Sequence, residues 1–234
     1  MKSDGAPALR SYDDSCGAAY GLSLVGDRWT LLVARELMLG PRRFSDLRAG
    51  LGGISANVLT QKLRRGLDVG MFQRRRLPPP AASWIYELTE WGLAAEPILQ
   101  ELGRWSVRHP DYDPSAPLSP VSFMLSLRTL FVSARAPGRA IAVNFIFGEE
   151  CYRCELLRKE ISVTRAEERA ADVTVRTDPN TAAFLVHHSK GLPSAADVSD
   201  SPIEGSIACF REFASAFEMP QISKSFSASA RIAE

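Results

Sequence analysis

The chain has 234 residues, which exceeds the usual size of one domain, so two domains are the first expectation. Its composition, 45% hydrophobic and 24% charged, is ordinary for a soluble globular protein. No apolar run approaches the roughly 20 residues that span a bilayer, and the N-terminus lacks a signal-peptide core. These features predict a cytoplasmic protein with no membrane partner.

The cysteines predict neither a disulfide framework nor a metal site. Cys151 and Cys154 form a CxxC pair, but a structural zinc site needs a second ligand pair, and the chain has no other CxxC. We therefore expect two small residues on a strand, with no metal and no cofactor. No Gly-x-Ser-x-Gly motif and no glycine-rich phosphate loop is present, so we expect no catalytic residues and no enzymatic activity.

Positive charge is concentrated in one window, although the net charge of the chain is only +1. Residues 42–76 contain nine basic residues against two acids, a net charge of +7. Such a window is typical of a phosphate-binding surface, while a solvated charged face is the alternative. The predicted local structure favours the phosphate-binding surface.

Residues 12–108 predict a DNA-binding domain after a disordered N-terminus at 1–11. Apolar residues recur at helical spacing from Cys16 to Leu39 and are interrupted at Gly26-Asp27, which predicts two helices with Asp27 capping the second. A short helix follows over 44–51, and Ser55 caps the next one. Two strand-like runs joined by three prolines then form a hairpin, and Thr89 begins a helix from Glu90 to about Val107. This order of elements is that of a winged helix-turn-helix.

The remainder predicts a second, α+β domain over 119–220, with a linker at 109–118 and a tail at 221–234. The linker contains three prolines among small and polar residues. The expected helices cover 121–134, a segment after Asp178-Pro179, and 205–217; the expected strands cover 140–147, 151–157, 159–164 and 171–177, and 197–201 is a further extended segment. We expect an antiparallel sheet with helices on one face.

Five segments of the first domain follow a family pattern. They are Cys16, GDRWT (26–30), GPRRFSDL (40–47), GISANVLTQKLR (53–64) and YELTEWG (86–92). In register over one domain, they resemble the HxlR family of bacterial winged-helix regulators. Gly66 departs from the leucine-acidic stretch usual in that family, and we expect it to loosen the end of the recognition helix.

The resemblance and the charge together predict a dimeric regulator, acting as a repressor, on a palindromic double-stranded DNA operator. The helix after Ser55 presents polar side chains that can bond bases, with Gln61 as the expected base reader. Arg42 and Arg43 are expected to bind phosphate. The predicted DNA-binding residues are Arg42, Arg43, Ser55, Asn57, Thr60, Gln61, Lys62, Arg64, Arg65, Arg74, Arg75 and Arg76.

Dimerisation is expected from apolar residues in excess of what the first domain can bury. They lie in the first helix (Tyr20, Leu22 and Val25) and in the helix over 90–107. Some members of the HxlR family use a cysteine near the position of Cys16 as a thiol sensor. Asp13 and Asp14 are expected to raise the pKa of Cys16 and to blunt its reactivity.

The second domain resembles a sterol carrier protein type 2 module. The residues that carry this likeness are 170–175, Asp178-Pro179-Asn180, Gly205, and the phenylalanines of the last helix. The resemblance implies a sheet covered by helices, often with an apolar tunnel, and hence an apolar or aromatic effector. The expected lining is Phe123, Leu127, Phe131, Phe145, Phe147, Phe184, Phe210, Phe213 and Phe217; the alternative is an ordinary aromatic core.

Two other functions remain open at this point. In one, the second domain is purely structural and Cys16 is the sensor. In the other, the protein is a lipid or small-molecule carrier that does not bind DNA. Concentrated charge over 42–76 argues against the carrier, because a protein contact does not require it.

Overall fold

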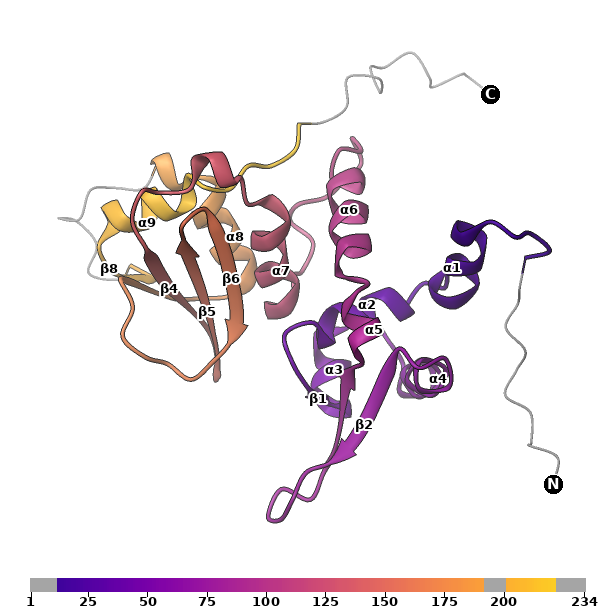
Figure 1. Ribbon diagram of the computed structural model, residues 1–234. Coiled ribbons are helices and arrows are strands. Elements are labelled where there is room, and N and C mark those ends of the chain that lie inside the picture. The colour runs from indigo at the N-terminus through magenta and orange to yellow at the C-terminus, as the bar shows by residue number, and fades with distance from the viewer. Residues whose placement is uncertain (1–11, 192–200, 222–234) are drawn as a thin grey trace, which may run out of the picture. The chain divides into compact units, whose positions relative to one another are not determined.

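The computed structural model describes residues 12–191 and 201–221, in two units that divide after Leu99 (Figure 1). The expected disordered segment 1–11, most of the extended segment 197–201 and nearly all of the tail fall outside the described residues. Helix α6, Glu96–Ser106, crosses the division. No helix in the described ranges is long and apolar enough to cross a membrane.

The first unit is a winged helix-turn-helix, as predicted. Its helices are α1 (Gly17–Val25), α2 (Thr30–Leu37), α3 (Phe44–Gly50), α4 (Ala56–Asp68) and α5 (Glu90–Leu93). Its antiparallel sheet has the order β1-β3-β2, formed by β1 (Arg42–Arg43), β3 (Trp84–Leu88) and β2 (Phe72–Arg76). The hairpin of β2 and β3 is the wing, and it follows α4 directly.

A small apolar core holds α4 against the other helices. Leu59 and Leu63 of α4 are buried, together with Val33 of α2 and Leu47 of α3. Each buried aliphatic side chain contributes about 1.5–3 kcal/mol relative to exposure. One face of α4 is therefore held against the core, and its opposite face remains exposed.

The single helix expected over 90–107 is two helices, α5 and α6. Pro97 lies in the first turn of α6. Its ring would clash with the carbonyl of Leu93, four residues earlier, and it has no N–H to donate there. The helix therefore ends at Leu93 and begins again at Glu96.

The second unit contains a five-stranded sheet of order β6-β5-β4-β7-β8. Its strands are β4 (Ile141–Phe147), β5 (Glu150–Leu157), β6 (Glu160–Arg165), β7 (Val173–Arg176) and β8 (Ile203–Gly205). Its helices are α7 (Pro120–Leu130), α8 (Pro179–His187) and α9 (Ile207–Ala214), with short 3-10 turns η1 (Ser133–Arg135) and η2 (Ser189–Gly191).

The sheet is mixed, and the expectation of a purely antiparallel sheet was wrong. β4, β5 and β6 form an antiparallel meander, but β7 runs parallel to β4, with Val143 opposite Val173. A hairpin can join only antiparallel neighbours, so the chain cannot pass from β4 to its parallel neighbour β7 by a tight turn. It passes through β5 and β6 first, and residues 166–172 then cross from the edge strand β6 to the far side of β4.

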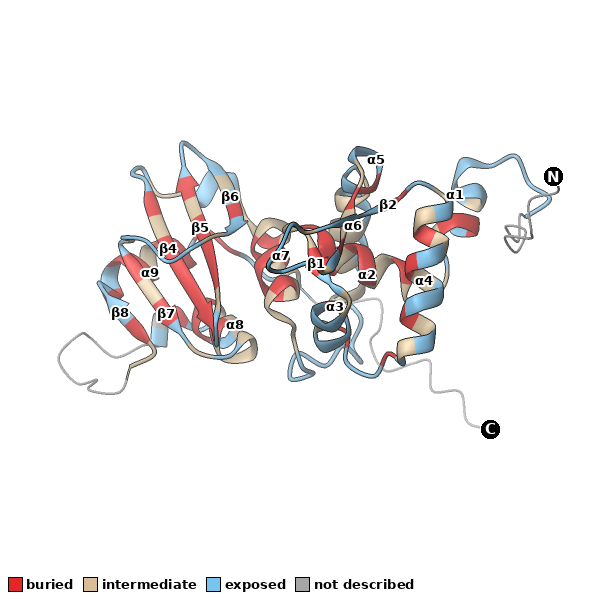
Figure 2. Ribbon diagram, turned by 90° about the horizontal axis from the view of Figure 1, so that it is seen from below, coloured by how far each residue is buried: buried red, intermediate tan, exposed pale blue. Residues whose placement is uncertain are grey.

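The helices cover one face of this sheet. Phe123 of α7 and Phe213 of α9 both contact the ring of Phe145 in β4, and α8 packs against α7 and α9. β4 and β5 are buried along most of their length (Figure 2). On the other face, the crossover is held by Asn144, whose Nδ2 donates to the Arg169 carbonyl at 2.6 Å, and by Arg153, which donates to the Ala170 carbonyl at 3.0 Å.

Candidate DNA interface

Helix α4 presents a row of polar side chains on its exposed face. Ser55 caps the helix, because its Oγ accepts the backbone N–H of Val58 at 3.2 Å. The exposed positions recur at three- and four-residue spacing, which places them on the face opposite the buried leucines. They are Asn57, Thr60, Gln61 and Arg64. The structure thus brings four of the predicted DNA-binding residues onto one surface.

Arg42 and Arg43 are neighbours with opposite surroundings. Arg42 pairs with Tyr86 across β1 and β3, and only 7% of its surface is exposed. Arg43 is exposed at the start of α3, where its backbone N–H donates to Asp46 Oδ2 at 3.2 Å. Successive side chains in a strand point to opposite sides, so only one of the pair can face solvent. Phosphate binding, predicted for both, is therefore retained only for Arg43.

Lys62 and Arg65 lie on the flank of α4 and have partners within the protein. Lys62 Nζ is 3.1 Å from Asp27 Oδ1, and 21% of the Lys62 side chain is exposed. Arg65 donates from Nη2 to the backbone carbonyl of Ser23 in α1. Both were predicted to contact DNA, and the structure places neither in the exposed row.

The three wing arginines are exposed but differ in their contacts. Arg75 Nε lies 3.3 Å from Glu87 Oε1. Arg74 stacks over the ring of Trp84, with its guanidinium carbon 4.8 Å from the ring centroid. Arg76 donates to the carbonyl of Ala82 at 3.2 Å. Because Arg75 has an acidic partner, Arg74 and Arg76 carry the uncompensated charge of β2.

Cys16 is exposed at the N-terminus of α1. Its pKa lies below the usual thiol value because the backbone N–H groups of Ala19 and Ala18 stabilise the thiolate. Asp14, expected to raise this pKa, instead accepts the backbone N–H of Cys16 at 2.9 Å. The direction expected from the two aspartates was therefore wrong, because the backbone N–H groups at the helix N-terminus set it.

Most of the predicted effector-binding residues form one packed cluster in the second unit. The rings of Phe123 and Phe145 are 5.0 Å apart and those of Phe213 and Phe217 are 4.9 Å apart. Leu127 is buried in α7. Phe131, Phe147 and Phe210 join the same cluster through further ring contacts.

Phe184 lies outside this cluster. It is 59% exposed, and its ring stacks on that of His188 at 4.3 Å. Among the described residues, ring contacts thus join seven of the nine predicted lining residues, Leu127 is buried, and Phe184 is left at the surface. This packing favours the alternative of an ordinary aromatic core.

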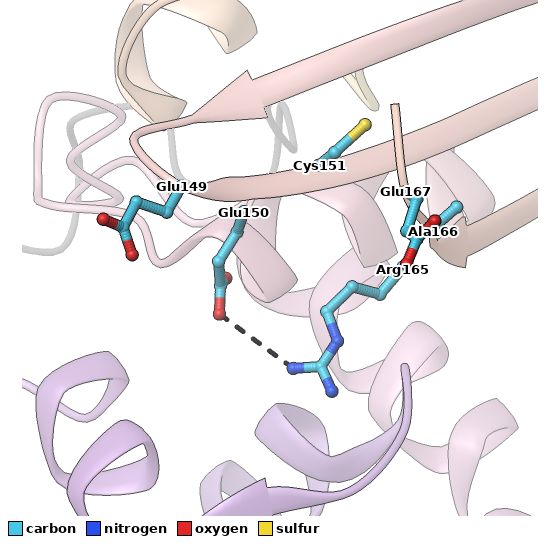
Figure 3. Close-up of a pocket in the computed structure, with 6 residues that line it drawn as sticks. All are labelled: Glu149, Glu150, Cys151, Arg165, Ala166 and Glu167. Atoms are coloured by element: carbon cyan, nitrogen blue, oxygen red, sulfur yellow. Dashed lines mark ion pairs between the residues drawn. The ribbon is translucent and has the colours of Figure 1, made fainter. Parts of the chain in front are cut away.

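A hollow of about 420 Å³ lies elsewhere in the second unit, at the turn between β4 and β5 (Figure 3). Its lining contains three glutamates and Arg165, whose Nη1 is 4.0 Å from Glu150 Oε1. This open, charged hollow is not the apolar pocket expected, and it contains none of the nine predicted residues.

The CxxC pair does not converge on one point. Cys154 is fully buried beneath the helices, and its pKa is raised by burial. Cys151 is three residues away on the same strand, so its side chain points to the opposite face. Within the described ranges, no group of three His, Cys, Asp or Glu side chains could hold a metal ion.

Asp27 supports α4 from the α1–α2 turn, and its role was only partly predicted. A capping role follows from its place before α2, and its side chain accepts the backbone N–H groups of Trp29 and Thr30 at 2.9 and 3.1 Å. The ion pair with Lys62 is a long-range contact, for which the local pattern contains no signal.

The comparisons with known proteins agree with this geometry. The model of the HxlR-like helix-turn-helix family matches residues 24–113. The HTH-type transcriptional regulator YodB of Bacillus subtilis is 34% identical over 84 residues, covering 36% of this chain and 75% of that protein. The uncharacterised HTH-type transcriptional regulator Mb3122 of Mycobacterium bovis is 38% identical over 104 residues, covering 43% of this chain and 64% of that protein.

A solved structure of the reduced form of YodB is also similar. It has a TM-score of 0.38 and 31% identity, and it covers 41% of this chain and 95% of that chain. The match to the family model and the sequence match that covers 75% of YodB show which family the first unit represents. The chain belongs to the HxlR-like helix-turn-helix family of transcriptional regulators.

Proposed function

We propose that this protein is a sequence-specific DNA-binding regulator that inserts α4 into the major groove of a palindromic operator. The observation that carries the proposal is the exposed row Asn57, Thr60, Gln61 and Arg64, opposite the buried leucines of the same helix. Amide side chains can pair bidentately with adenine, and a guanidinium can do so with guanine. Gln61 is the base reader that we propose.

Phosphate contacts complete this interface. Arg43 at the start of α3 and Arg74 and Arg76 in the wing are exposed cations on elements that flank α4. They would fix the position of the protein on the duplex without reading sequence. Ser55 caps α4. We propose that the N-terminus of α4 at Ser55 also binds a DNA phosphate, because backbone N–H groups at a helix N-terminus favour an anion.

Selection of duplexes from a randomised pool tests the proposal directly. The wild-type protein should enrich a palindromic sequence, and a reporter gene placed behind that sequence should be repressed. Gln61→Ala should weaken binding to the selected duplex by about 1–3 kcal/mol and leave a shuffled duplex of the same composition unaffected. Failure to enrich any sequence would contradict the proposal and favour a carrier that does not bind DNA.

We propose further that the protein binds DNA as a homodimer. Tyr20 and Leu22 in α1 are 58% and 56% exposed, and Trp91 and Ile98 are exposed to a similar extent. A unit that leaves several large apolar side chains exposed is a candidate for association with a second copy. A two-fold symmetric pair of recognition helices would match a palindrome.

Effector binding in the second unit is proposed on narrower grounds. It is supported by the resemblance to sterol carrier modules and by a sheet covered on one face by three helices. The ring contacts around Phe145 and Phe213 support the alternative, a purely structural unit. Two measurements distinguish an effector-binding unit from a purely structural one. They are native mass spectrometry of the purified protein and thermal shifts with fatty acids and aromatic acids. A bound apolar molecule is expected, and Leu127→Trp should abolish its binding while operator binding survives.

Thiol sensing at Cys16 is a second candidate for the switching signal. One specific observation favours it: Cys16 is exposed and its pKa is lowered at the N-terminus of α1. Loss of operator binding on treatment with a quinone or diamide, absent in Cys16→Ser, would support it.

A further inference from the structure

The recognition helix is tied to the end of α1 and to the α1–α2 turn by two side chains. Lys62 reaches Asp27 in the turn, with Nζ 3.1 Å from Oδ1. Arg65, almost one helical turn further along α4, donates to the carbonyl of Ser23, a buried residue near the end of α1. Two separated attachments restrain rotation of α4 about its axis more than one attachment could.

The anchor at Asp27 is itself rigid. Its carboxylate accepts the backbone N–H groups of Trp29 and Thr30, and Thr30 Oγ1 lies 2.5 Å from Oδ2. Burial raises the pKa of Asp27, but the hydrogen bonds from Thr30 and Trp29 and the charge of Lys62 outweigh burial and leave this pKa below its usual value. Asp27 therefore stays ionised at neutral pH and holds a fixed orientation for Lys62.

We propose that Lys62 and Arg65 are positioning residues, which hold α4 at the angle needed for base reading and do not themselves contact DNA. The inference rests on the proposed function, since it requires α4 to be the reading helix. Functional side chains lose their geometry when their support moves by about 0.5 Å or 10–20°. Loss of the Lys62–Asp27 ion pair or of the Arg65–Ser23 hydrogen bond should therefore reduce binding to the operator and leave sequence-independent binding intact.

The chain provides matched controls within the same helix. Gln61 precedes Lys62, and Arg64 precedes Arg65, and both of these neighbours are exposed. Arg64 and Arg65 have the same charge and nearly the same position in sequence. A difference between them must come from where each guanidinium lies.

The experiment compares Asp27→Asn, Lys62→Met and the double variant on two probes. The probes are the duplex selected by the wild-type protein from a randomised pool and a shuffled duplex of the same composition. Asparagine retains an oxygen for the Trp29 and Thr30 N–H groups and removes the charge. Each single variant should weaken binding to the selected duplex by about two- to fivefold, as for a partly exposed ion pair. The double variant should be no weaker than either single one, because both remove the same interaction.

Salt dependence distinguishes a positioning residue from a phosphate contact. Lys62→Met and Arg65→Met should keep the wild-type slope of log affinity against log salt. Arg43→Met, at a proposed phosphate contact, should reduce the slope by about 0.9 and weaken binding to both duplexes. Arg64→Met, which removes an exposed cation of the proposed base-reading row, should also reduce the slope but should weaken binding to the selected duplex most. Lys62→Arg should restore binding, because arginine can also pair with Asp27. Thermal melting of every variant checks the fold, and Lys62→Met and Arg65→Met carry the test if Asp27→Asn is unstable.

Two results would contradict the inference, and they can be distinguished from each other. If Lys62→Met lowers the salt slope as Arg64→Met does, while Asp27→Asn binds as tightly as wild type or tighter, then Lys62 contacts phosphate and the inference is overturned. If the wild-type protein enriches no duplex, the proposed function fails, and this inference fails with it.

Discussion

Gly66 of α4 lies so close to Phe72 of β2 that a Cβ added at Gly66 would be 2.0 Å from Phe72 Cδ2. Phe72 is almost fully buried at the base of the wing. The glycine therefore permits the recognition helix and the wing to pack directly against each other. Its effect differs from that expected from helix propensity, because it does not loosen the end of α4, which continues to Asp68.

Gly66→Ala should lower the free energy of unfolding by about 1–3 kcal/mol, since overpacking against Phe72 outweighs the gain of about 1 kcal/mol in helix propensity. Gly103→Ala in α6 is the control. There the added Cβ meets nothing nearer than Thr129 Cγ2 at 4.0 Å, so a gain of about 0.5–1 kcal/mol is expected. Urea denaturation measures both. Equal stability of Gly66→Ala and wild type would mean that Phe72 can move aside.

Arg42 and Arg43 should differ in what their loss affects. Arg42→Ala should lower the free energy of unfolding by about 1–3 kcal/mol, because a buried arginine leaves its partners unsatisfied when it is removed. Arg43→Ala should change stability by no more than about 0.5 kcal/mol and reduce the salt slope of DNA binding by about one. Denaturation and salt titration on the same two proteins check this, and a reversed pattern would exclude Arg43 as the phosphate contact.

Cys16 should react with iodoacetamide faster than the other three cysteines. The lowered pKa of Cys16 means that its thiolate forms at lower pH than in a free thiol of pKa 9.0, so labelling should rise with pH and reach half its maximum below that value. Burial raises the pKa of Cys151 and Cys154. Both should label only after denaturation. Peptide mass spectrometry after timed labelling identifies each site, and early labelling of Cys154 would contradict its burial.

A charge placed in the exposed apolar surface of the first unit should dissociate the proposed dimer. Leu22→Glu in α1 would place a carboxylate at a position that is 56% exposed in this chain. Sedimentation should then give a monomer, and affinity for the selected duplex should fall. Leu157→Glu, at a 54% exposed leucine in the second unit, is the matched control and should stay dimeric. A wild-type monomer at micromolar concentration would contradict the dimer itself.

Local features of the sequence determined most of the secondary structure. Helical spacing of apolar residues, Ser55 and Thr89 as caps, and the proline-rich hairpin depend on interactions within a few residues, so they can be recognised without a fold. Both caps are present, with Thr89 Oγ1 accepting the N–H of Gly92 at 3.1 Å. The helical spacing also predicted which face of α4 is exposed.

Only the tertiary structure decided which basic residues are available to DNA. Arg42, Lys62 and Arg65 belong to the same charged window as Arg43 and Arg64, and charge counting cannot separate them. Their burial or pairing depends on β3, on the α1–α2 turn and on α1, which are distant in sequence. The parallel pairing of β4 and β7 and the need for glycine at position 66 are likewise contacts between distant segments. A local sequence pattern cannot predict such contacts, because they form only when elements distant in sequence pack together.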